Sequence, residues 1–304
     1  MSNLLKKTFV YAGIFSILLI LLDISILLKT FVIPSAITSV PDQHNTNTST
    51  DANSNTQDAI ITDTSYQDDH IQISIETFRK YNTNIYIADI TLSSADYLQT
   101  ALAHNIFGTN ITEKTSVLAQ EHNAIFAING DYYGANNKGY VIKNSTLYRN
   151  SIRDNADYGD LVIYQDGTFD IIDETQISAE QLLQNGVTNL FAFGPTLIKN
   201  SMITVSEHEE VKRAMSSNPR TAIGIIDSLH YIVLVSDGRT SENEGLSLYE
   251  VSQIMFEYGC TTAYNLDGGG SSTMYFNGKI MNNPTTNGKK ISERAVSDIV
   301  YIGY

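Results

Sequence analysis

Short stretches in which apolar and polar residues alternate dominate the chain from about residue 70 to its end. Alternation with a period of two, rich in Ile, Val, Tyr and Phe, is typical of β-strands. The stretches lie at residues 71–78, 84–90, 124–129, 159–165, 168–173, 189–194, 221–226, 231–237, 262–267, 272–276 and 298–304. A chain with this many strand patterns has to fold around β-sheet, with helices in a supporting role.

Helical patterns are fewer. The clearest covers residues 247–258, SLYEVSQIMFEY, where the apolar residues fall on one stripe, Ser247 supplies an N-cap, Glu250 follows three residues later and Gly259 comes at the end. Two shorter helices are expected at 113–122 and 178–185. No fixed-period repeat is present. The sequence therefore predicts an α+β fold, a single domain at 70–304 around a large mixed β-sheet with a few helices.

The N-terminal region has a different character. Residues 8–33 form an apolar run that only Asp23 interrupts, long enough at 1.5 Å per residue to cross a ~30 Å hydrocarbon core. Lys6 and Lys7 precede it, so the positive-inside rule predicts a cytoplasmic segment at 1–7, a transmembrane signal anchor at 8–33 and an extracytoplasmic remainder. A cleaved signal peptide is the alternative.

Residues 34–69 are expected to be a disordered linker, because the segment is rich in Asn, Thr, Ser and Asp and has few large apolar residues. Such a coil would hold the domain about 30 Å from its anchor on average.

The charge balance disfavours two kinds of nonspecific partner. Nineteen Lys and Arg residues against 33 Asp and Glu residues leave a net charge of −14. An acidic chain is repelled by phosphate backbones and by anionic lipid head groups, so no nucleic-acid partner is expected. Cys260 is the single cysteine, so the fold contains no intrachain disulfide.

Polar clusters rich in Asn, Asp, Arg and Gly recur where strand patterns begin or end, at 129–134, 193–196, 218–221, 236–239 and 265–271. One such cluster by itself is best interpreted as a turn. Five clusters with the same chemistry indicate a functional site built from strand ends.

The residue types in these clusters indicate chemistry on a sugar phosphate. Carboxylates can act as acid, base or nucleophile at a glycosidic bond, arginine binds phosphate in a bidentate manner, and successive glycines can form an anion-binding nest. The candidate catalytic residues are Asp131, Asp237, Asp267 and Asn129; the candidate substrate- and phosphate-binding residues are Arg220, Thr221, Arg239, Gly268, Gly269, Gly270, Ser271 and Arg294. Ser271 or Ser272 as a nucleophile stays open. No cofactor is required, although a divalent cation, Ca²⁺ or Mg²⁺, could bind near the aspartates.

These motifs as a set resemble the phosphodiester glycosidase family. The resemblance is carried by AINGDYYG (127–134), FGPTLIKNS (193–201), NPRTAIGI (218–225), LVSDGR (234–239), the long block 245–278 that contains NLDGGGSSTM, and the closing segment up to residue 304. It implies hydrolysis of a sugar-1-phosphate diester to a free sugar and a phosphomonoester. It also implies a site at Asn129, Asp131, Arg220, Asp237, Arg239, Asp267, Gly268, Gly269, Ser271 and Arg294.

The expected function is an extracytoplasmic hydrolase of sugar-1-phosphate diesters in a cell-wall polymer or exopolysaccharide. In this interpretation Arg220 and Arg239 hold the phosphate, while the three aspartates share the acid/base and charge-stabilising roles. A noncatalytic wall-glycan binding module and a sugar-phosphate transferase are the alternatives.

Overall fold

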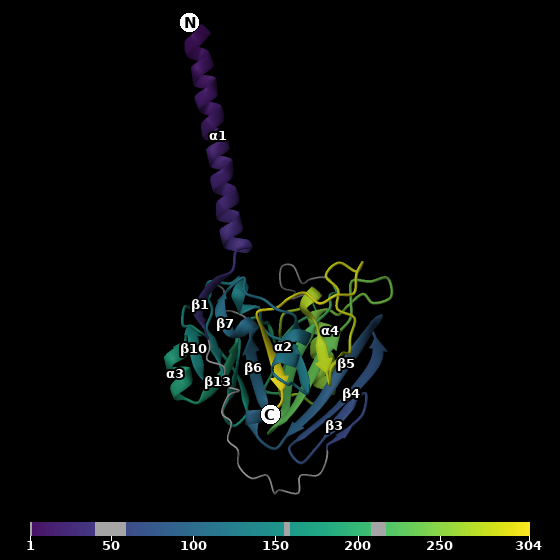
Figure 1. Ribbon diagram of the computed structural model, residues 1–304. Helices are drawn as coiled ribbons and strands as arrows, with labels where there is room; N and C mark the ends of the chain where they lie inside the picture. Colours follow the sequence, from purple (N-terminus) through teal and green to yellow (C-terminus); the bar gives the residue numbers. More distant parts are fainter. Residues whose placement is uncertain (1, 40–58, 155–158, 208–216) are drawn as a thin grey trace.

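The computed structural model describes residues 2–39, 59–154, 159–207 and 217–304. Strands make up most of the regular secondary structure, in agreement with the predicted α+β class, and each of the eleven predicted strands is present in the structure. One long helix, α1 (Ser2–Phe31), extends away from the rest (Figure 1).

The largest sheet has nine strands, and every pairing described within it is antiparallel. Its order is β15 (Met202–Ile203), β14 (Thr196–Lys199), β18 (Thr262–Asn265), β16 (Thr221–Asp227), β17 (His230–Ser236), β5 (Thr83–Leu92), β4 (Ile71–Lys80), β3 (Ser65–Gln67) and β2 (Ile60–Ile61). Tyr81 and Asn82 connect β4 to β5 with φ values of 52° and 51°, the left-handed conformation that a two-residue hairpin turn requires.

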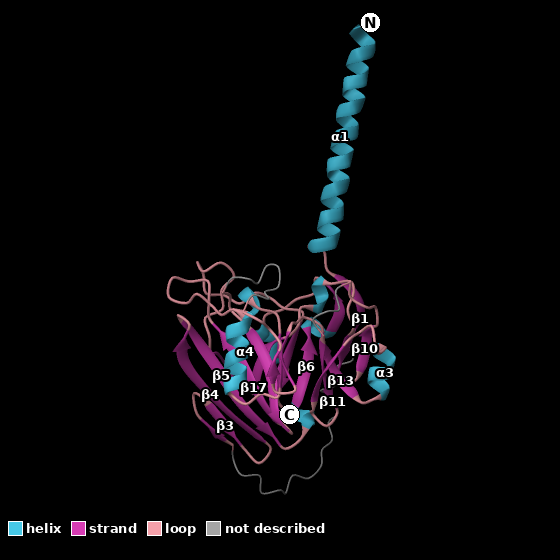
Figure 2. Ribbon diagram, turned by 180° about the vertical axis from the view of Figure 1, so that it is seen from behind, coloured by secondary structure: helices cyan, strands magenta, loops and turns pink. Residues whose placement is uncertain are grey.

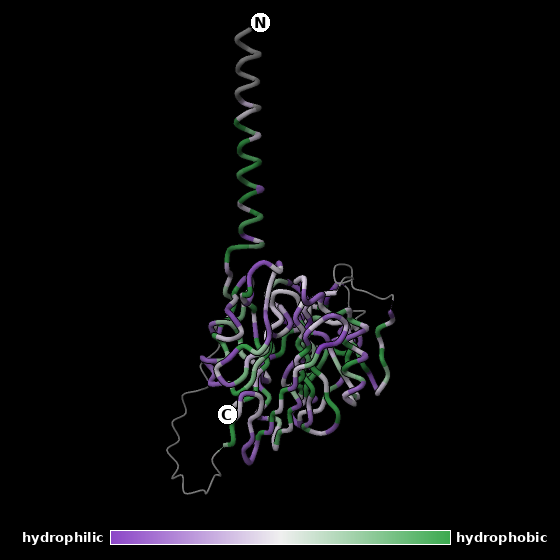
Figure 3. The backbone as a smooth tube through the Cα atoms, turned by 90° about the vertical axis from the view of Figure 1, so that its right-hand side faces the viewer, coloured by the Kyte–Doolittle hydropathy of each residue, from purple (hydrophilic) through white to green (hydrophobic). Residues whose placement is uncertain are grey.

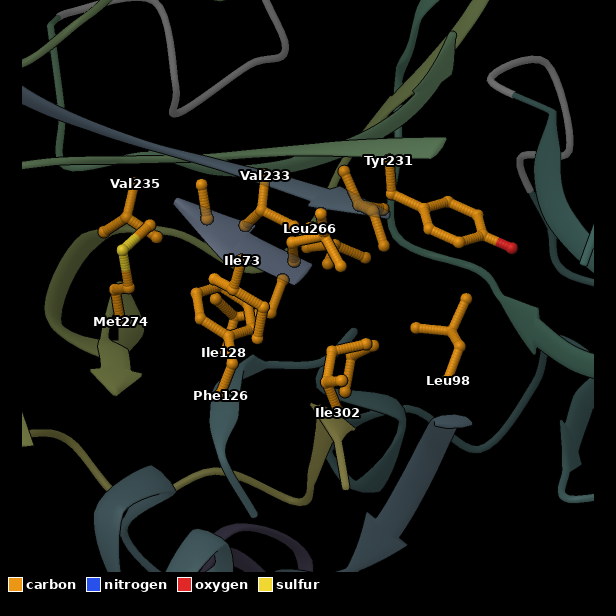
Figure 4. Packing of buried hydrophobic residues seen from close by; sticks show 14 of the residues in the cluster. Ile73, Leu98, Phe126, Ile128, Tyr231, Val233, Val235, Leu266, Met274 and Ile302 are labelled. Atoms are coloured by element: carbon orange, nitrogen blue, oxygen red, sulfur yellow. The ribbon is translucent and has the colours of Figure 1, made fainter. Parts of the chain in front are cut away.

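A five-stranded sheet supplies the second layer. Its order is β20 (Lys279–Ile280), β19 (Met274–Phe276), β8 (Phe126–Asn129), β21 (Asp298–Ile302) and β6 (Leu98–Leu102). Side chains from the two sheets meet in one apolar core: Val233 and Val235 point toward Phe126, Met274 and Ile302 (Figure 4). This packing fixes the ends of strands from both sheets relative to one another.

Helices cover the outer faces of the sheets. Leu248, Val251 and Ile254 of α4 (Leu248–Glu257) pack on the nine-stranded sheet. The predicted capping box forms at its start, where the Ser247 side chain accepts from the Glu250 amide and Glu250 accepts from the Ser247 amide. The shorter predicted helices are α2 (Thr115–Glu121), which packs on the five-stranded sheet, and α3 (Ala179–Gln184).

Three small sheets complete the fold (Figure 2). They comprise β12 (Phe169–Ile172), β11 (Asp160–Tyr164) and β13 (Val187–Phe191); β9 (Val141–Lys143) with β10 (Thr146–Arg149); and β1 (Ser35–Ser39) with β7 (Ile106–Thr109). Single-turn helices lie at Ala95–Tyr97, Ala103–Asn105, Tyr133–Ala135 and Gly269–Ser271.

Helix α1 carries the predicted apolar span. Within the described residues, the segment Gly13–Phe31 is long and apolar enough to cross a membrane, and none of it is buried in the fold. Figure 3 shows it as a mostly hydrophobic helix outside the body of the protein. The chain thus has one N-terminal apolar helix that fits a membrane anchor or a signal peptide.

The structure corrects the predicted linker at both of its ends. Residues Ser35–Ser39 form β1, which pairs with β7, and residues 60–67 contribute β2 and β3 to the edge of the nine-stranded sheet. Backbone pairing orders these strands even though each is only two to five residues long, and Tyr66 adds one buried side chain. Residues 40–58 of the predicted linker lie outside the described residues.

Replacing Ser247 with Ala removes the bond that the Ser247 side chain accepts from the Glu250 amide and leaves the bond from the Ser247 amide to Glu250. We expect the free energy of unfolding, measured by urea denaturation, to fall by about 1 kcal/mol. Ser241→Ala changes an exposed serine nearby and serves as the control, with an expected change below about 0.5 kcal/mol. Equal effects of the two substitutions would show that the cap does not stabilise the fold.

Candidate functional site

The ends of strands from both large sheets converge on one region. In the strand registers Ala222 lies opposite Asn265, Thr221 opposite Val235, and Ile299 opposite Asn129. The predicted polar clusters that follow β8, β17 and β18 and precede β16 are therefore neighbours in space. The topology thus brings four of the five predicted polar clusters together.

The side chain of Asn129 joins three of these strand ends. Its Nδ2 donates to the backbone oxygen of Asp267 at 2.6 Å, and its Oδ1 accepts from Thr221 Oγ1 at 2.8 Å and from the Thr273 amide at 3.3 Å. Asn129 is fully buried, so this amide is committed to the protein itself. The geometry favours a positioning role for Asn129 and Thr221, holding the glycine-rich loop in place, over the predicted catalytic and binding roles.

Asp267 presents a carboxylate at the start of the glycine-rich loop. Its Oδ1 accepts from the Gly268 amide at 2.8 Å, and its Oδ2 lies 3.0 Å from Arg294 Nη2. Burial raises the pKa of Asp267, because removing the charged form from water is costly, and Arg294 opposes that shift. A carboxyl group with a raised pKa beside a cation is suited to proton transfer.

Two arginines border the same loop. Arg294 donates Nε to Ser271 Oγ at 2.9 Å and Nη2 to the Gly268 oxygen at 3.0 Å, and it lies 5.9 Å from the ring centroid of the partly exposed Tyr132.

Arg239 is exposed, with Nε donating to Asn218 Oδ1 at 3.1 Å and Nη1 to the Thr286 oxygen at 2.6 Å. Partial burial lowers its pKa, and the positive charge of Arg294 adds to this effect. Two guanidinium groups that repel one another across a loop would be stabilised by an anion between them.

The glycines act differently from the predicted nest. The Gly268 amide donates to Asp267 and the Gly269 amide to the Pro219 oxygen at 2.8 Å, so two of the three predicted anion donors are already used. Their small size matters instead: a Cβ on Gly268 would lie 2.8 Å from the Pro219 oxygen, and one on Gly269, whose φ is 64°, would lie 2.7 Å from Arg239 Nη2. A Cβ on Gly270 would overlap Thr286. The loop needs glycine to pack closely around the arginines.

Asp237 is held by four donors. Its Oδ1 accepts from the Asn283 amide at 2.7 Å, and its Oδ2 accepts from Asn283 Nδ2 at 3.0 Å, from Tyr86 Oη at 3.2 Å and from Asn84 Nδ2 at 3.5 Å. These bonds use both carboxylate oxygens to tie the loop after β20 to β5. These contacts favour a structural role for Asp237, which holds the loop after β20 against β5.

Arg220 is likewise buried, and its Nε donates to the Leu246 oxygen at 2.8 Å. This contact links the segment before β16 to the segment before α4. The sequence predicted that Arg220 and Arg239 hold the phosphate together. In the structure Arg220 is buried, whereas Arg239 is exposed.

Asp131 belongs to a buried charge cluster whose other members the sequence analysis did not single out. Lys143 Nζ lies 2.7 Å from Asp298 Oδ2, 3.7 Å from Asp131 Oδ1 and 3.7 Å from the centroid of the Phe191 ring. The 2.7 Å ion pair is a charge contact without the alignment of a hydrogen bond. Gly130 leaves room for this cluster, because a Cβ there would overlap the Asp298 carboxyl group. In the sequence, the signal for this charge cluster is Lys143, a lysine at the end of the apolar stretch YVIK.

The oxygens of Asp131 accept from the backbone. Oδ1 accepts from the Tyr133 amide at 3.2 Å, and Oδ2 from the Ala192 amide at 2.9 Å. Asp131 thereby connects the turn after β8 to the end of β13. Burial raises the pKa of the neighbouring Asp298 to about 6, against the opposing charge of Lys143.

The three predicted aspartates thus have separate sets of partners. Within the described residues, no three His, Cys, Asp or Glu side chains are grouped so that they could hold a metal ion. The divalent cation therefore stays a prediction, and no step is assigned to it. A cavity of about 460 Å³ lies elsewhere, between β6, β13 and the β9–β10 turn, and of the charge cluster only Lys143 lines it.

The comparison with family models decides the classification. The phosphodiester glycosidase model matches residues 122–303, which include every candidate residue from Asn129 to Arg294. The chain belongs to the phosphodiester glycosidase family. Membership in this family supports a hydrolase-like function, and α1 and the strands up to β7 lie outside the match.

Several curated proteins share part of the family domain. The SPbeta prophage-derived uncharacterized protein YomE of Bacillus subtilis is 31% identical over 203 residues, covering 65% of this chain and 31% of that protein. The N-acetylglucosamine-1-phosphodiester alpha-N-acetylglucosaminidase of Bos taurus is 31% identical over 145 residues, covering 43% of this chain and 26% of that enzyme. The aligned part thus spans less than a third of each of these relatives.

Two solved structures show a similar fold. The zebrafish N-acetylglucosamine-1-phosphodiester alpha-N-acetylglucosaminidase catalytic domain, auto-inhibited by its pro-peptide, has a TM-score of 0.60 and 21% identity and covers 77% of this chain and 83% of that one. A hypothetical protein from Synechocystis has a TM-score of 0.53 and 15% identity, and covers 77% of this chain and 62% of that one. At these identities the likeness concerns the fold alone.

The buried Asp298 of this family member predicts a pH dependence of stability. Its pKa in the folded protein is about 6, above the ~3.9 of an aspartate in an unfolded chain. The folded state then binds more protons between these two values, so stability should fall as pH rises from about 4 to 6. We expect Asp298→Asn to flatten this part of the profile of unfolding free energy against pH.

Asp170→Asn, at an exposed aspartate, is the control and should keep the wild-type slope. If Asp298→Asn does not fold, the carboxyl carbon of Asp298 can be titrated by NMR in the wild type. A titration midpoint near 4 would contradict the burial argument.

Proposed function

We propose that this protein is an extracytoplasmic hydrolase of glycosyl phosphodiesters, with Asp267 as the acid/base residue and Arg239 and Arg294 as the phosphate-binding pair. The observation that carries the proposal is the buried Asp267 carboxylate, with its raised pKa, 3.0 Å from Arg294 and at the loop that Arg239 also borders. Lys6 and Lys7, before the apolar helix, support a cytoplasmic N-terminus and a domain outside.

The proposed reaction breaks the bond between the anomeric carbon of the sugar and the bridging phosphate oxygen. Ionised Asp267 takes a proton from water, whose oxygen forms the new bond to the anomeric carbon. The bond to phosphate breaks, and its electron pair leaves with the phosphate oxygen. The products are a free sugar and a phosphomonoester. The proton on Asp267 then passes to solvent.

Each side chain has a physical reason for its role. Arg239 and Arg294 neutralise the charge that grows on the phosphate as it leaves, and their positions are fixed before the reaction by bonds to Asn218, Thr286 and Ser271. The ring of Tyr132, which is 39% exposed, offers an apolar face for a sugar ring beside Arg294. A cell-wall polymer or an exopolysaccharide with sugar-phosphate links is the substrate class that fits this location.

The test uses the full chain in detergent with methyl esters of several sugar 1-phosphates. We expect release of free sugar and methyl phosphate, with oxygen from ¹⁸O-labelled water found in the sugar. Asp267→Asn should lower kcat by on the order of 10²- to 10⁴-fold. Arg239→Gln should cost on the order of 10²-fold in kcat/KM.

Lys80→Gln is the matched control, because Lys80 is a cation on the surface paired with Glu257. It should leave turnover unchanged. Full turnover in Asp267→Asn would refute the assignment of Asp267. Binding without turnover on any ester would favour the glycan-binding module, and transfer of the sugar to an alcohol in place of water would favour a transferase.

A further inference from the structure

The connection between the apolar helix and the first strand of the fold is very short. Helix α1 ends at Phe31, and β1 begins at Ser35 and pairs with β7, with Ser35 opposite Thr109 and Ala36 opposite Gly108. Asn110 Nδ2 reinforces this junction by donating to the backbone oxygens of Thr30 at 3.1 Å and Ile33 at 3.4 Å. The end of α1 is therefore held against β7 and not separated from it by a long tether.

Strand β7 in turn contacts the loop that carries Tyr132. The Asn110 amide donates to the Gly134 oxygen at 3.1 Å, and a Cβ on Gly134 would lie 3.3 Å from the Gly108 oxygen. Gly134 is in the single-turn helix Tyr133–Ala135, which directly follows Tyr132, and the Tyr132 ring faces Arg294. A short series of direct contacts thus connects the end of α1 to the phosphate-binding pair.

A cationic loop lies at the same end of the fold. The yellow loop before β21 is at the end from which α1 rises (Figure 1). It exposes Lys289 and Lys290, and Ile291 is 55% exposed. A Cβ on Gly288 would overlap the Arg239 backbone oxygen, so this loop packs directly on the site. In a chain with a net charge of −14, adjacent cations beside an exposed isoleucine are suited to anionic head groups at a membrane surface.

We propose that the substrate is attached to a lipid: a glycosyl phosphodiester whose phosphate is esterified to a lipid in the membrane that α1 spans. The inference rests on the proposed function and adds the substrate class. The junction of α1, β1 and β7 holds Arg239, Arg294 and Asp267 close to the head-group region, where such a phosphate lies. Water then displaces the phosphate at the anomeric carbon, the free sugar leaves, and the lipid keeps the phosphate as a monoester.

The physical advantage is a high local concentration and a restricted orientation. A lipid substrate and an anchored enzyme that share one membrane meet without a search in three dimensions, and a short junction keeps the site facing the surface. A flexible linker at the junction would retain the anchor and lose the fixed orientation.

The experiment reconstitutes the full chain in vesicles of phosphatidylcholine and phosphatidylglycerol. The probes are the hexadecyl ester of N-acetylglucosamine 1-phosphate in the same vesicles and the methyl ester in solution. We expect kcat/KM for the hexadecyl ester to exceed that for the methyl ester by about tenfold or more. Asp267→Asn should lower both activities by the same factor, on the order of 10²- to 10⁴-fold.

Two variants test the geometry. A flexible Gly-Ser segment inserted between Ile33 and Pro34 keeps α1 and β1, and it should remove most of the tenfold preference without changing turnover of the methyl ester. The double variant Lys289→Gln, Lys290→Gln should lower hydrolysis of the hexadecyl ester several-fold, again with the methyl ester unaffected.

The outcomes separate the two proposals. Hydrolysis of the methyl ester with no preference for the hexadecyl ester overturns the lipid-attached substrate and leaves the proposed function intact. Hydrolysis of neither ester refutes the proposed function, and the inference fails with it. A preference that survives the inserted segment unchanged overturns the role of the α1–β1 junction.

Discussion

The hydrogen bonds of the Asn129 side chain are the constraint on which the candidate site depends. One buried amide contacts the backbone on either side of the glycine-rich loop, at Asp267 and Thr273, and also the hydroxyl of Thr221. These partners come from both large sheets, so the amide transfers the rigidity of the two-layer core to the loop. Backbone bonds act in the same direction, since the Asp267 amide donates to the Gly130 oxygen at 3.2 Å and β19 pairs with β8 directly after Thr273.

Charge gives this loop its chemical character. The chain is strongly acidic, yet Arg239 and Arg294 border the loop. Asp267 pairs with one of them, and its burial raises its pKa against the opposing charge of that arginine. The second buried cluster, Lys143 with Asp131 and Asp298, supports the turn after β8 from inside the protein. In the proposed mechanism the Asp267 cluster carries the chemistry, and the Lys143 cluster supports the turn after β8.

The sequence predicted the parts of the fold that depend on periodicity. Long alternations such as 71–78 and 298–304 became strands, and the Ser247 capping box formed as expected, because local signals determine both. The strands β1, β2 and β3 were missed since segments of two to five residues carry no readable period, and pairing with other strands orders them.

At the site, sequence predicted which clusters meet, and it could not predict which atoms are already bonded. Asp237 and Arg220 belong to the right clusters, but four donors surround the first and the second is buried. The same residue types serve support and chemistry, so only their partners distinguish them.

The most direct measurement is a crystal structure of the protein with a non-hydrolysable glycosyl phosphonate. The account predicts that the phosphonate oxygens lie between the guanidinium groups of Arg239 and Arg294, with the anomeric carbon facing Asp267. A phosphonate bound at Arg149 or Arg153, whose guanidinium groups donate to backbone carbonyls, and away from Asp267 would contradict it.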